Sequence, residues 1–261
     1  MVDKMKKQGQ ITIFVIIALL FVGAIILFFL VRTGKISVPG AFEEDPQRFI
    51  ENCIEPKIKE SINLLTSQGG NTNPRLYKTF KFSEDKVYKN ISYLCYTPKN
   101  YITCVNQEPL LINHLEIEIF NYIHEEIENC FVSWENKMQA LGYEVKMENL
   151  DFLVELEPGQ VIVEADRIIT ANKKEESFSY DNFRVVIRNK IYDLAIVAQE
   201  ILSQEGEYCS FSQQGFGLLY PEFRVEIFRT SDLNNIYTVT DKGSSEKFRF
   251  AVRGCVIPPG L

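Results

Sequence analysis

The chain has 261 residues, of which 46% are hydrophobic and 24% charged, and its net charge is −7. This composition is far from the low-hydrophobicity, high-charge signature of disordered chains, so a core can form. The first 35 residues hold five basic side chains and one acidic one, which leaves a net charge of −11 on the remainder. An acidic domain repels phosphate backbones. This excludes nucleic acid as an expected partner and argues against a flat location on an anionic lipid surface.

Residues 10–32 predict a transmembrane helix. From Ile11 to Val31 the sequence has no charged residue, and Thr12 is its only polar side chain. A helix of this length covers roughly 30 Å, the thickness of the hydrocarbon core of a bilayer. A buried globular helix is normally shorter and has a polar face. We therefore expect the chain to contact the lipid bilayer through residues 11–31.

The charges that flank this helix predict its orientation in the cell membrane. The basic residues before it are Lys4, Lys6 and Lys7. After it, Arg32 and Lys35 soon give way to three acidic residues that begin at Glu43. Because cytoplasmic flanks carry the excess of Lys and Arg, residues 1–9 are expected to form a basic cytoplasmic leader. The C-terminal domain is then extracellular.

The residues at the start of the span form a short motif, which reads Lys6, Lys7, Gln8, Gly9, Gln10, Ile11, Thr12, Ile13 and Phe14. This motif resembles the class III, type IV pilin-like leader. In that family a peptidase cuts on the cytoplasmic side after a glycine, which implies cleavage after Gly9, a new N-terminus at Gln10 and a retained hydrophobic helix. Many pilins carry Glu at the fifth mature position, where this chain has Phe14. A plain, uncleaved signal-anchor is the alternative.

A stalk and a helix are expected next. Residues 33–44 contain Gly and Pro without helical periodicity and predict a short stalk. Asp45 and Pro46 suit the start of a helix, and apolar residues then recur at helical spacing as far as the glycines that begin at Gly69. Pro56 is expected to bend or divide this helix, because its ring removes a backbone donor.

The remainder of the segment 45–142 predicts strands and a second long helix. Residues 76–82 and the alternating pattern within 87–104 predict strands, with turn residues at 98–100. Residues 108–142 carry apolar side chains at helical spacing, which predicts the longest amphipathic helix.

From Tyr143 onward the period of the apolar residues changes to two, which predicts a β-rich part over 143–261. The expected elements are a hairpin around 157–160, strands at 177–188, 223–228, 236–240 and 248–252, and a helix at 191–204. The predicted fold class is α+β, with an exported domain of amphipathic helices packed on antiparallel sheet over residues 45–261. Whether 45–142 and 143–261 form separate parts stays open.

All cysteines of the chain follow the predicted span. They are Cys53, Cys95, Cys104, Cys130, Cys209 and Cys255. An even count in an exported domain predicts disulfides, and the spacings fit no zinc pattern. The alternative is six free thiols in a domain that faces the cytosol.

Three disulfide pairs are expected. The hairpin turn at 98–100 brings Cys95 near Cys104. The tetrapeptide IENC ends at Cys53 and again at Cys130, each time within an apolar helical pattern, which favours a pair between two helices packed by similar faces. The last two cysteines of the chain are then left for each other by elimination.

Four sequence segments follow one another along the chain in a recognisable order: FIENCI, SINLLTSQGG, EIFNYIHEEIENCF and, after the β-rich stretch, FRFAVRGC. This order looks like a family of single-span surface proteins from small-genome archaea, whose activity is unknown. The resemblance covers most of the chain. It implies the anchored topology and no activity.

The residues with catalytic or metal-binding potential form no recognisable pattern. His114 and His124 are the only histidines, and His124 lacks the second histidine of the metalloprotease pattern. No GxSxG, GxxxxGK or GxGxxG sequence is present. We therefore expect no enzyme activity, no cofactor and no metal site. A chemistry that uses only carboxylates, such as glycoside hydrolysis, escapes this test.

Two further short motifs have local interpretations. Asn90, Ile91 and Ser92 form the only N-glycosylation acceptor, so Asn90 is a candidate for modification. Residues 215–217, Gly-Phe-Gly, predict a turn beside Cys209.

The sequence thus predicts a non-enzymatic, membrane-anchored cell-surface protein. Its expected role is adhesion, or assembly of an envelope or pilus-like structure, with protein partners at the cell surface. The alternative is a tethered extracytoplasmic binding protein or enzyme. A filament requires cleavage after Gly9 and association between helices, whereas a tethered monomer requires neither.

Overall fold

The computed structural model describes residues 21, 22, 45–174 and 176–257. The chain divides into two compact units, Met1–Asp45 and Pro46–Leu261. The predicted leader with Gly9 and Gln10, the predicted stalk and all but two residues of the predicted span lie outside the described residues. Within the described ranges, no helix is long and apolar enough to cross a membrane.

Two long helices form one layer of the second unit. α2 spans Pro46–Gln68 and α3 spans Leu111–Ala140. α2 is continuous, so the predicted division at Pro56 does not occur. Pro56 lies on the exposed face of the helix, where water can bind the carbonyl group that loses its donor.

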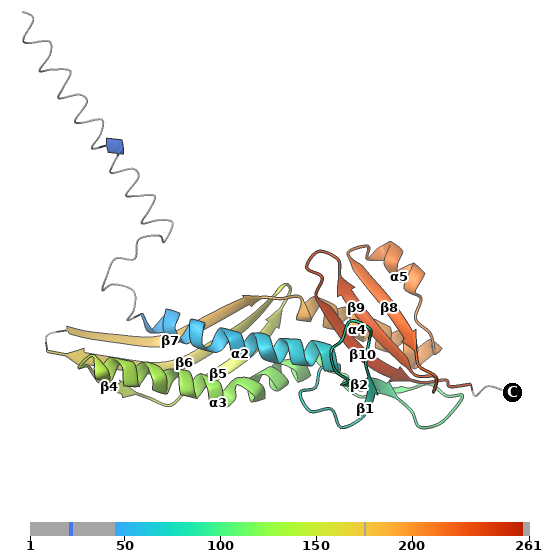
Figure 1. Ribbon diagram of the computed structural model, residues 1–261, viewed down its shortest axis with the longest axis horizontal. Coiled ribbons are helices and arrows are strands. Elements are labelled where there is room, and N and C mark those ends of the chain that lie inside the picture. The colour runs from blue at the N-terminus through green and yellow to red at the C-terminus, as the bar shows by residue number, and fades with distance from the viewer. Residues whose placement is uncertain (1–20, 23–44, 175, 258–261) are drawn as a thin grey trace, which may run out of the picture. The chain divides into compact units, whose positions relative to one another are not determined.

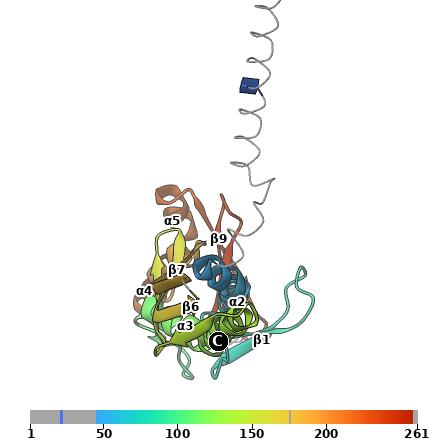
Figure 2. The same ribbon diagram turned by 90° about the vertical axis from the view of Figure 1, so that its left-hand side faces the viewer.

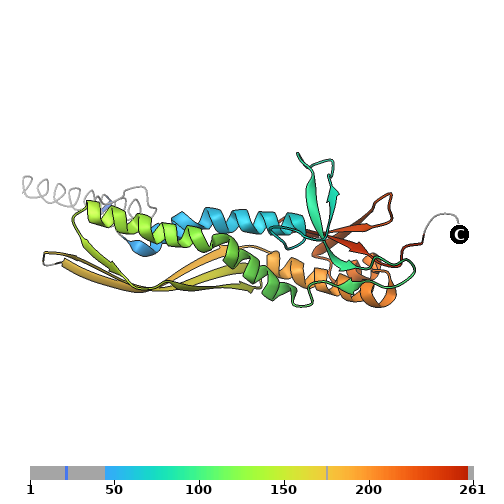
Figure 3. The same cartoon turned by 90° about the horizontal axis from the view of Figure 1, so that it is seen from below.

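A four-stranded antiparallel sheet lies against these helices. It contains β4 (Glu144–Met147), β5 (Asp151–Glu157), β6 (Gln160–Lys173) and β7 (Glu176–Arg188). β4 and β5 pair with successive parts of one edge of β6, and β7 pairs with the other edge. Figure 3 shows the two helices in one layer and these strands in the other, and Figure 2 shows the helices side by side.

Side chains from the helices bind both edges of this sheet. Gln47 of α2 donates its amide to the carbonyl of Arg184 in β7 at 2.6 Å. Glu116 of α3 accepts the backbone N–H of Leu156 in β5 at 3.0 Å. These contacts satisfy edge groups that would otherwise be free to pair with another chain.

The second sheet has six strands, which come from both ends of the described sequence. They are β1 (Tyr77–Phe80), β2 (Lys89–Tyr96), β3 (Val105–Asn106), β8 (Phe223–Arg229), β9 (Asn235–Asp241) and β10 (Lys247–Arg253). The order is β1-β2-β10-β9-β8, and β3 pairs with β2. α4 (Ile191–Tyr208) packs on β2, β9 and β10, and α5 (Gln213–Leu219) lies against β8 (Figure 1).

The α+β class is confirmed, with one correction to the expected antiparallel sheet. β2 and β10 run parallel, with Ala251 opposite Tyr93. This pair unites the predicted helical part 45–142 with the β-rich part 143–261 in one sheet, so the two segments share their packing.

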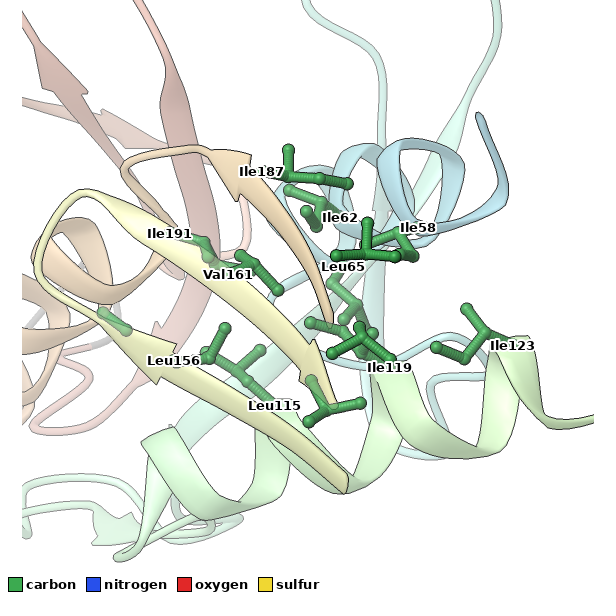
Figure 4. Packing of buried hydrophobic residues seen from close by; sticks show 14 of the residues in the cluster. Ile58, Ile62, Leu65, Leu115, Ile119, Ile123, Leu156, Val161, Ile187 and Ile191 are labelled. Atoms are coloured by element: carbon green, nitrogen blue, oxygen red, sulfur yellow. The ribbon is translucent and has the colours of Figure 1, made fainter. Parts of the chain in front are cut away.

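A continuous apolar core fills the space between the helices and the sheets. Figure 4 shows residues from both helices and three strands of the first sheet converging in it. The labelled side chains include Ile58, Ile62, Leu65, Leu115, Ile119, Ile123, Leu156, Val161 and Ile187. Burial of each such side chain contributes about 1.5–3 kcal/mol, so this layer supplies much of the stability of the unit.

Three disulfides connect the elements. Cys53 of α2 joins Cys130 of α3, with a Cα separation of 5.9 Å. Cys95 joins Cys104 at 5.3 Å, beside the pairing of β2 with β3. Cys209 joins Cys255 at 5.8 Å and ties the end of α4 to the residues after β10. These are the three pairs expected from the sequence.

Candidate functional site

The candidate site is a groove that α4 lines on one side, and both ends of this helix are held by specific contacts. At its start, Asn189 accepts the N–H of Ile191 at 2.9 Å, and Glu246 accepts the N–H of Lys190 at 2.6 Å. At its end, Cys209 adopts a left-handed conformation with φ of 57° and is held by its disulfide. The helix is therefore anchored at both ends.

α5 is a short helix that follows this disulfide. The hydroxyl of Ser212 accepts the N–H of Gly215 at 3.3 Å and caps the helix. Phe216 is buried, with its ring centroid 5.4 Å from Phe211 and 4.8 Å from Tyr220. The predicted turn at 215–217 is thus the middle of a helix, because the packing of Phe216 outweighs the low helix propensity of the two glycines.

A groove of about 850 Å³ lies between α4, α5 and the start of β8. Apolar side chains from all three elements line it: Tyr192, Ile196, Val197, Phe216, Leu219, Tyr220 and Phe223. Its volume is in the range of ligand-binding clefts.

The outer wall of the groove exposes large apolar side chains. Leu218 is 84% exposed and Leu219 is 76% exposed, and Ile196 and Tyr220 are also exposed. Ile196, Leu219 and Tyr220 line the groove and Leu218 neighbours Leu219 in α5, and exposed apolar side chains gathered in this way are typical of a protein interaction surface.

The charged side chains in the groove are all acidic. They are Asp193, Glu200 and Glu222, and no Lys or Arg lines the groove. Asp193 has a nearby cation, since its carboxylate is 3.4 Å from Lys190 Nζ. Glu200 accepts a hydrogen bond from Gln204 at 2.7 Å, a neutral partner that leaves its charge uncompensated. The rim therefore favours a positively charged partner.

The two histidines considered in the sequence do not come together, and two carboxylates of α3 near them have separate partners. His114 Nε2 is 2.9 Å from the carbonyl oxygen of Gly70, whereas His124 packs against the ring of Phe152. Glu116 binds the edge of β5, whereas Glu118 binds Thr72. No group of three or more His, Cys, Asp or Glu within the described residues can hold a metal ion.

Asn90, the candidate for glycosylation, lies in β2. Its Oδ1 accepts a hydrogen bond from the hydroxyl of Thr79, the residue opposite it in β1, at 2.9 Å. The candidate cleavage residues Gly9 and Gln10 lie outside the described part of the chain.

Of the residues that line the groove, the sequence singles out only Gly215 and Phe216, as part of a predicted turn. Ile196 fits the apolar pattern of a helix, and nothing local distinguishes an outward-facing isoleucine from a buried one. The consecutive Leu218 and Leu219 after two glycines are the available signal, because neighbouring exposed apolar side chains can contribute to a partner contact.

The comparisons with known proteins assign no family. No protein-family model matches the sequence, and no curated protein matches it.

Proposed function

We propose that the chain is a membrane-anchored cell-surface protein whose extracellular domain mediates adhesion or assembly by binding a partner protein in the groove between α4 and α5. One observation carries this proposal. An apolar groove lies between α4, whose C-terminal end is held by a disulfide, and α5, which ends in the highly exposed Leu218 and Leu219. Burial of Leu218 and Leu219 by a partner would contribute about 1.5–3 kcal/mol each.

The anchor and the location are proposed from the sequence together with the disulfides. Residues 10–32 provide the uncharged run for a membrane span, and the lysines before it favour a cytoplasmic N-terminus. Three disulfides are typical of a domain in an oxidising compartment outside the cytoplasm. The leader motif supports cleavage after Gly9 as part of the same proposal.

The partner segment is apolar and flanked by basic residues. Leu219, Tyr220 and Phe223 offer apolar contact, and the rim supplies only negative charge. The net charge of −11 on the chain after residue 35 attracts the same kind of partner from a distance. The complementary segment therefore carries aliphatic or aromatic anchors between Lys or Arg residues.

Site-specific photo-crosslinking on intact cells that display the full chain tests this proposal. A photoreactive residue replaces Leu219 in one variant and Leu153 in the control, because Leu153 is also an exposed leucine but lies on β5 outside the groove. We expect a crosslink only from position 219, to a partner peptide with apolar residues between basic ones. Equal crosslinking from both positions, or a crosslinked peptide that is acidic and polar, would contradict the proposal.

The second candidate function is a tethered extracytoplasmic binding protein. A separate polar pocket at the start of α3 favours this function.

A further inference from the structure

A polar pocket of about 430 Å³ lies away from the groove. Its walls come from the loop after α2, from β2, from the link between β3 and α3, and from the first turns of α3. Its polar lining includes Asn73, Arg75, Gln107, Glu108, His114 and Glu118. No residue of this pocket lines the groove.

The loop after α2 approaches its neighbours closely because it begins with two glycines. Gly69 and Gly70 have φ values of +73° and +84°, which favour glycine. A Cβ atom on Gly69 would lie 3.1 Å from the Cβ of Ser92, and one on Gly70 would lie 3.2 Å from a methyl of Leu115. The loop is therefore held directly against β2 and α3.

Hydrogen bonds fix the walls of the pocket. Glu118 Oε2 accepts both the N–H of Thr72 at 2.8 Å and its hydroxyl at 2.6 Å. Asn71 donates its amide to the hydroxyl of Ser92 at 3.0 Å. His114 is held between the carbonyl of Gly70 at 2.9 Å and the carboxylate of Glu108 at 3.5 Å. Glu118, Asn71 and His114 are thus held in place before any ligand arrives, which lowers the entropic cost of binding.

Several polar side chains of the pocket have atoms that make no hydrogen bond within the described part of the chain and could bind a ligand. Arg75 is exposed and makes no ion pair or hydrogen bond with any described residue. The Oε1 atom of Glu118 accepts no hydrogen bond from the described residues, and the amide of Asn73 is likewise unused. The pocket therefore offers donors and acceptors to a ligand at the same time.

The pocket carries charges of both signs, which disfavours a ligand with a net charge of either sign. The carboxylates of Glu108 and Glu118 repel a phosphate or a sulfate, and the guanidinium of Arg75 repels a metal ion. Most of the remaining lining is neutral amide and hydroxyl, which suits groups that both donate and accept hydrogen bonds. Hydroxyl groups on adjacent carbons fit planar carboxylate, amide and guanidinium groups in this way.

We propose that this pocket binds a neutral saccharide unit, with Arg75 donating to its hydroxyl oxygens and Glu118 accepting from its hydroxyl protons. The pocket shares no lining residue with the groove, so the proposal of saccharide binding can be tested separately from partner binding in the groove. A cell-surface domain with both sites would contact a protein partner and a glycan.

Saturation-transfer NMR on the full chain in lipid nanodiscs tests the saccharide site. The probes are glucose, galactose, mannose and N-acetylglucosamine, with glycine and glutamate as amino-acid probes. We expect transfer to at least one sugar and a loss of affinity of about tenfold or more in Arg75→Ala, since a hydrogen bond to a charged group is lost. Glu118→Gln should lower the affinity for the same sugar, because the substitution removes the negative charge. The glutamine side chain still offers an oxygen that can accept the hydrogen bonds of Thr72.

Arg224→Ala is the matched control, because Arg224 is an exposed arginine on β8 outside the pocket. It should bind the sugar as the unmodified chain does. Three results would overturn the proposal: no transfer to any of the sugars at about 10 mM, sugar binding that Arg75→Ala leaves unchanged, or binding of the amino acids that depends on Arg75 in the absence of sugar binding.

Discussion

Arg249 is the most consequential buried charge among the described residues. It is 6% exposed and lies on β10, where it donates to Asp85 at 2.9 Å and to Glu84 at 2.7 Å. Its guanidinium carbon is 4.4 Å from the centroid of the Phe82 ring. One side chain thus fixes the loop between β1 and β2 on the outer face of the second sheet. Removal of one partner of a buried ion pair lowers the free energy of unfolding by more than the pair contributes, because the other charge stays buried without compensation.

Replacement of Arg249 by methionine should lower the free energy of unfolding by about 3 kcal/mol, because it removes the closest cation from the largely buried Asp85, whereas the second partner, Glu84, is half exposed. Urea denaturation followed through Trp134, the only tryptophan and fully buried, measures this loss. Arg224→Met is the control, since its pair with Glu226 is exposed and should contribute less than about 1 kcal/mol. Equal losses in both variants would contradict the role of Arg249.

Glu205 gives the stability a specific pH dependence. It is 3% exposed in α4 and accepts the hydroxyl hydrogen bond of Tyr237. Burial raises the pKa of Glu205 above its usual value, even though the hydrogen bond from Tyr237 acts in the opposite direction. The folded state therefore binds this proton more tightly than the unfolded state does.

Glu205→Gln should remove a decline in stability with pH. The raised pKa means that the stabilising effect of the proton is complete below the ordinary glutamate pKa and is lost as the pH rises towards the folded-state value. Between these two pKa values, the free energy of unfolding should fall with rising pH in the unmodified chain, and it should fall less in Glu205→Gln. Glu200→Gln, on the exposed side of α4, should keep the decline, and an unchanged slope in Glu205→Gln would refute the assignment.

At the scale of elements, local patterns predicted most of the secondary structure. The helix expected at 108–142 is observed as Leu111–Ala140, because Leu115, Ile119 and Ile123 repeat every four residues on one buried face. The hairpin expected around 157–160 is the turn between β5 and β6, where Gly159 has a φ of +77°.

The elements that the sequence did not predict depend on distant contacts. β10 pairs with β2 across most of the described chain, and no local signal in Phe250 or Tyr93 indicates a parallel partner. α5 contains two glycines and forms through the burial of Phe216. The groove and the polar pocket arise only where such segments meet, which is why neither was predicted.

The disulfide between the two long helices and the disulfide of the β2–β3 hairpin should contribute differently to stability. Cys53 and Cys130 are 77 residues apart, whereas Cys95 and Cys104 are 9 apart. The longer closed loop restricts the unfolded chain more, so replacing Cys53 and Cys130 by alanine should cost about 2 kcal/mol more than replacing the hairpin pair. Urea denaturation of the two double variants measures the difference. A larger loss from the hairpin pair would show that strain or packing outweighs the entropy of the unfolded state.

At the scale of the whole molecule, the proposed membrane anchor precedes a disulfide-linked domain with two separate candidate binding sites. The second unit shares one core between its helices and both sheets, which gives the groove and the polar pocket rigid walls. The anchor rests on the uncharged run of residues 11–31, and the external location rests on the flanking lysines and the oxidised cysteines.

Peptide mass spectrometry without reductant, on the chain isolated from cell membranes, tests the central claim most directly. We expect the chain to retain residues 10–32 and to begin at Gln10 if the leader is cleaved or at Met1 if it is a signal-anchor. We also expect linked peptides that join Cys53 to Cys130, Cys95 to Cys104 and Cys209 to Cys255. Six free thiols, or a chain that lacks the hydrophobic segment, would contradict a membrane-anchored domain outside the cytoplasm.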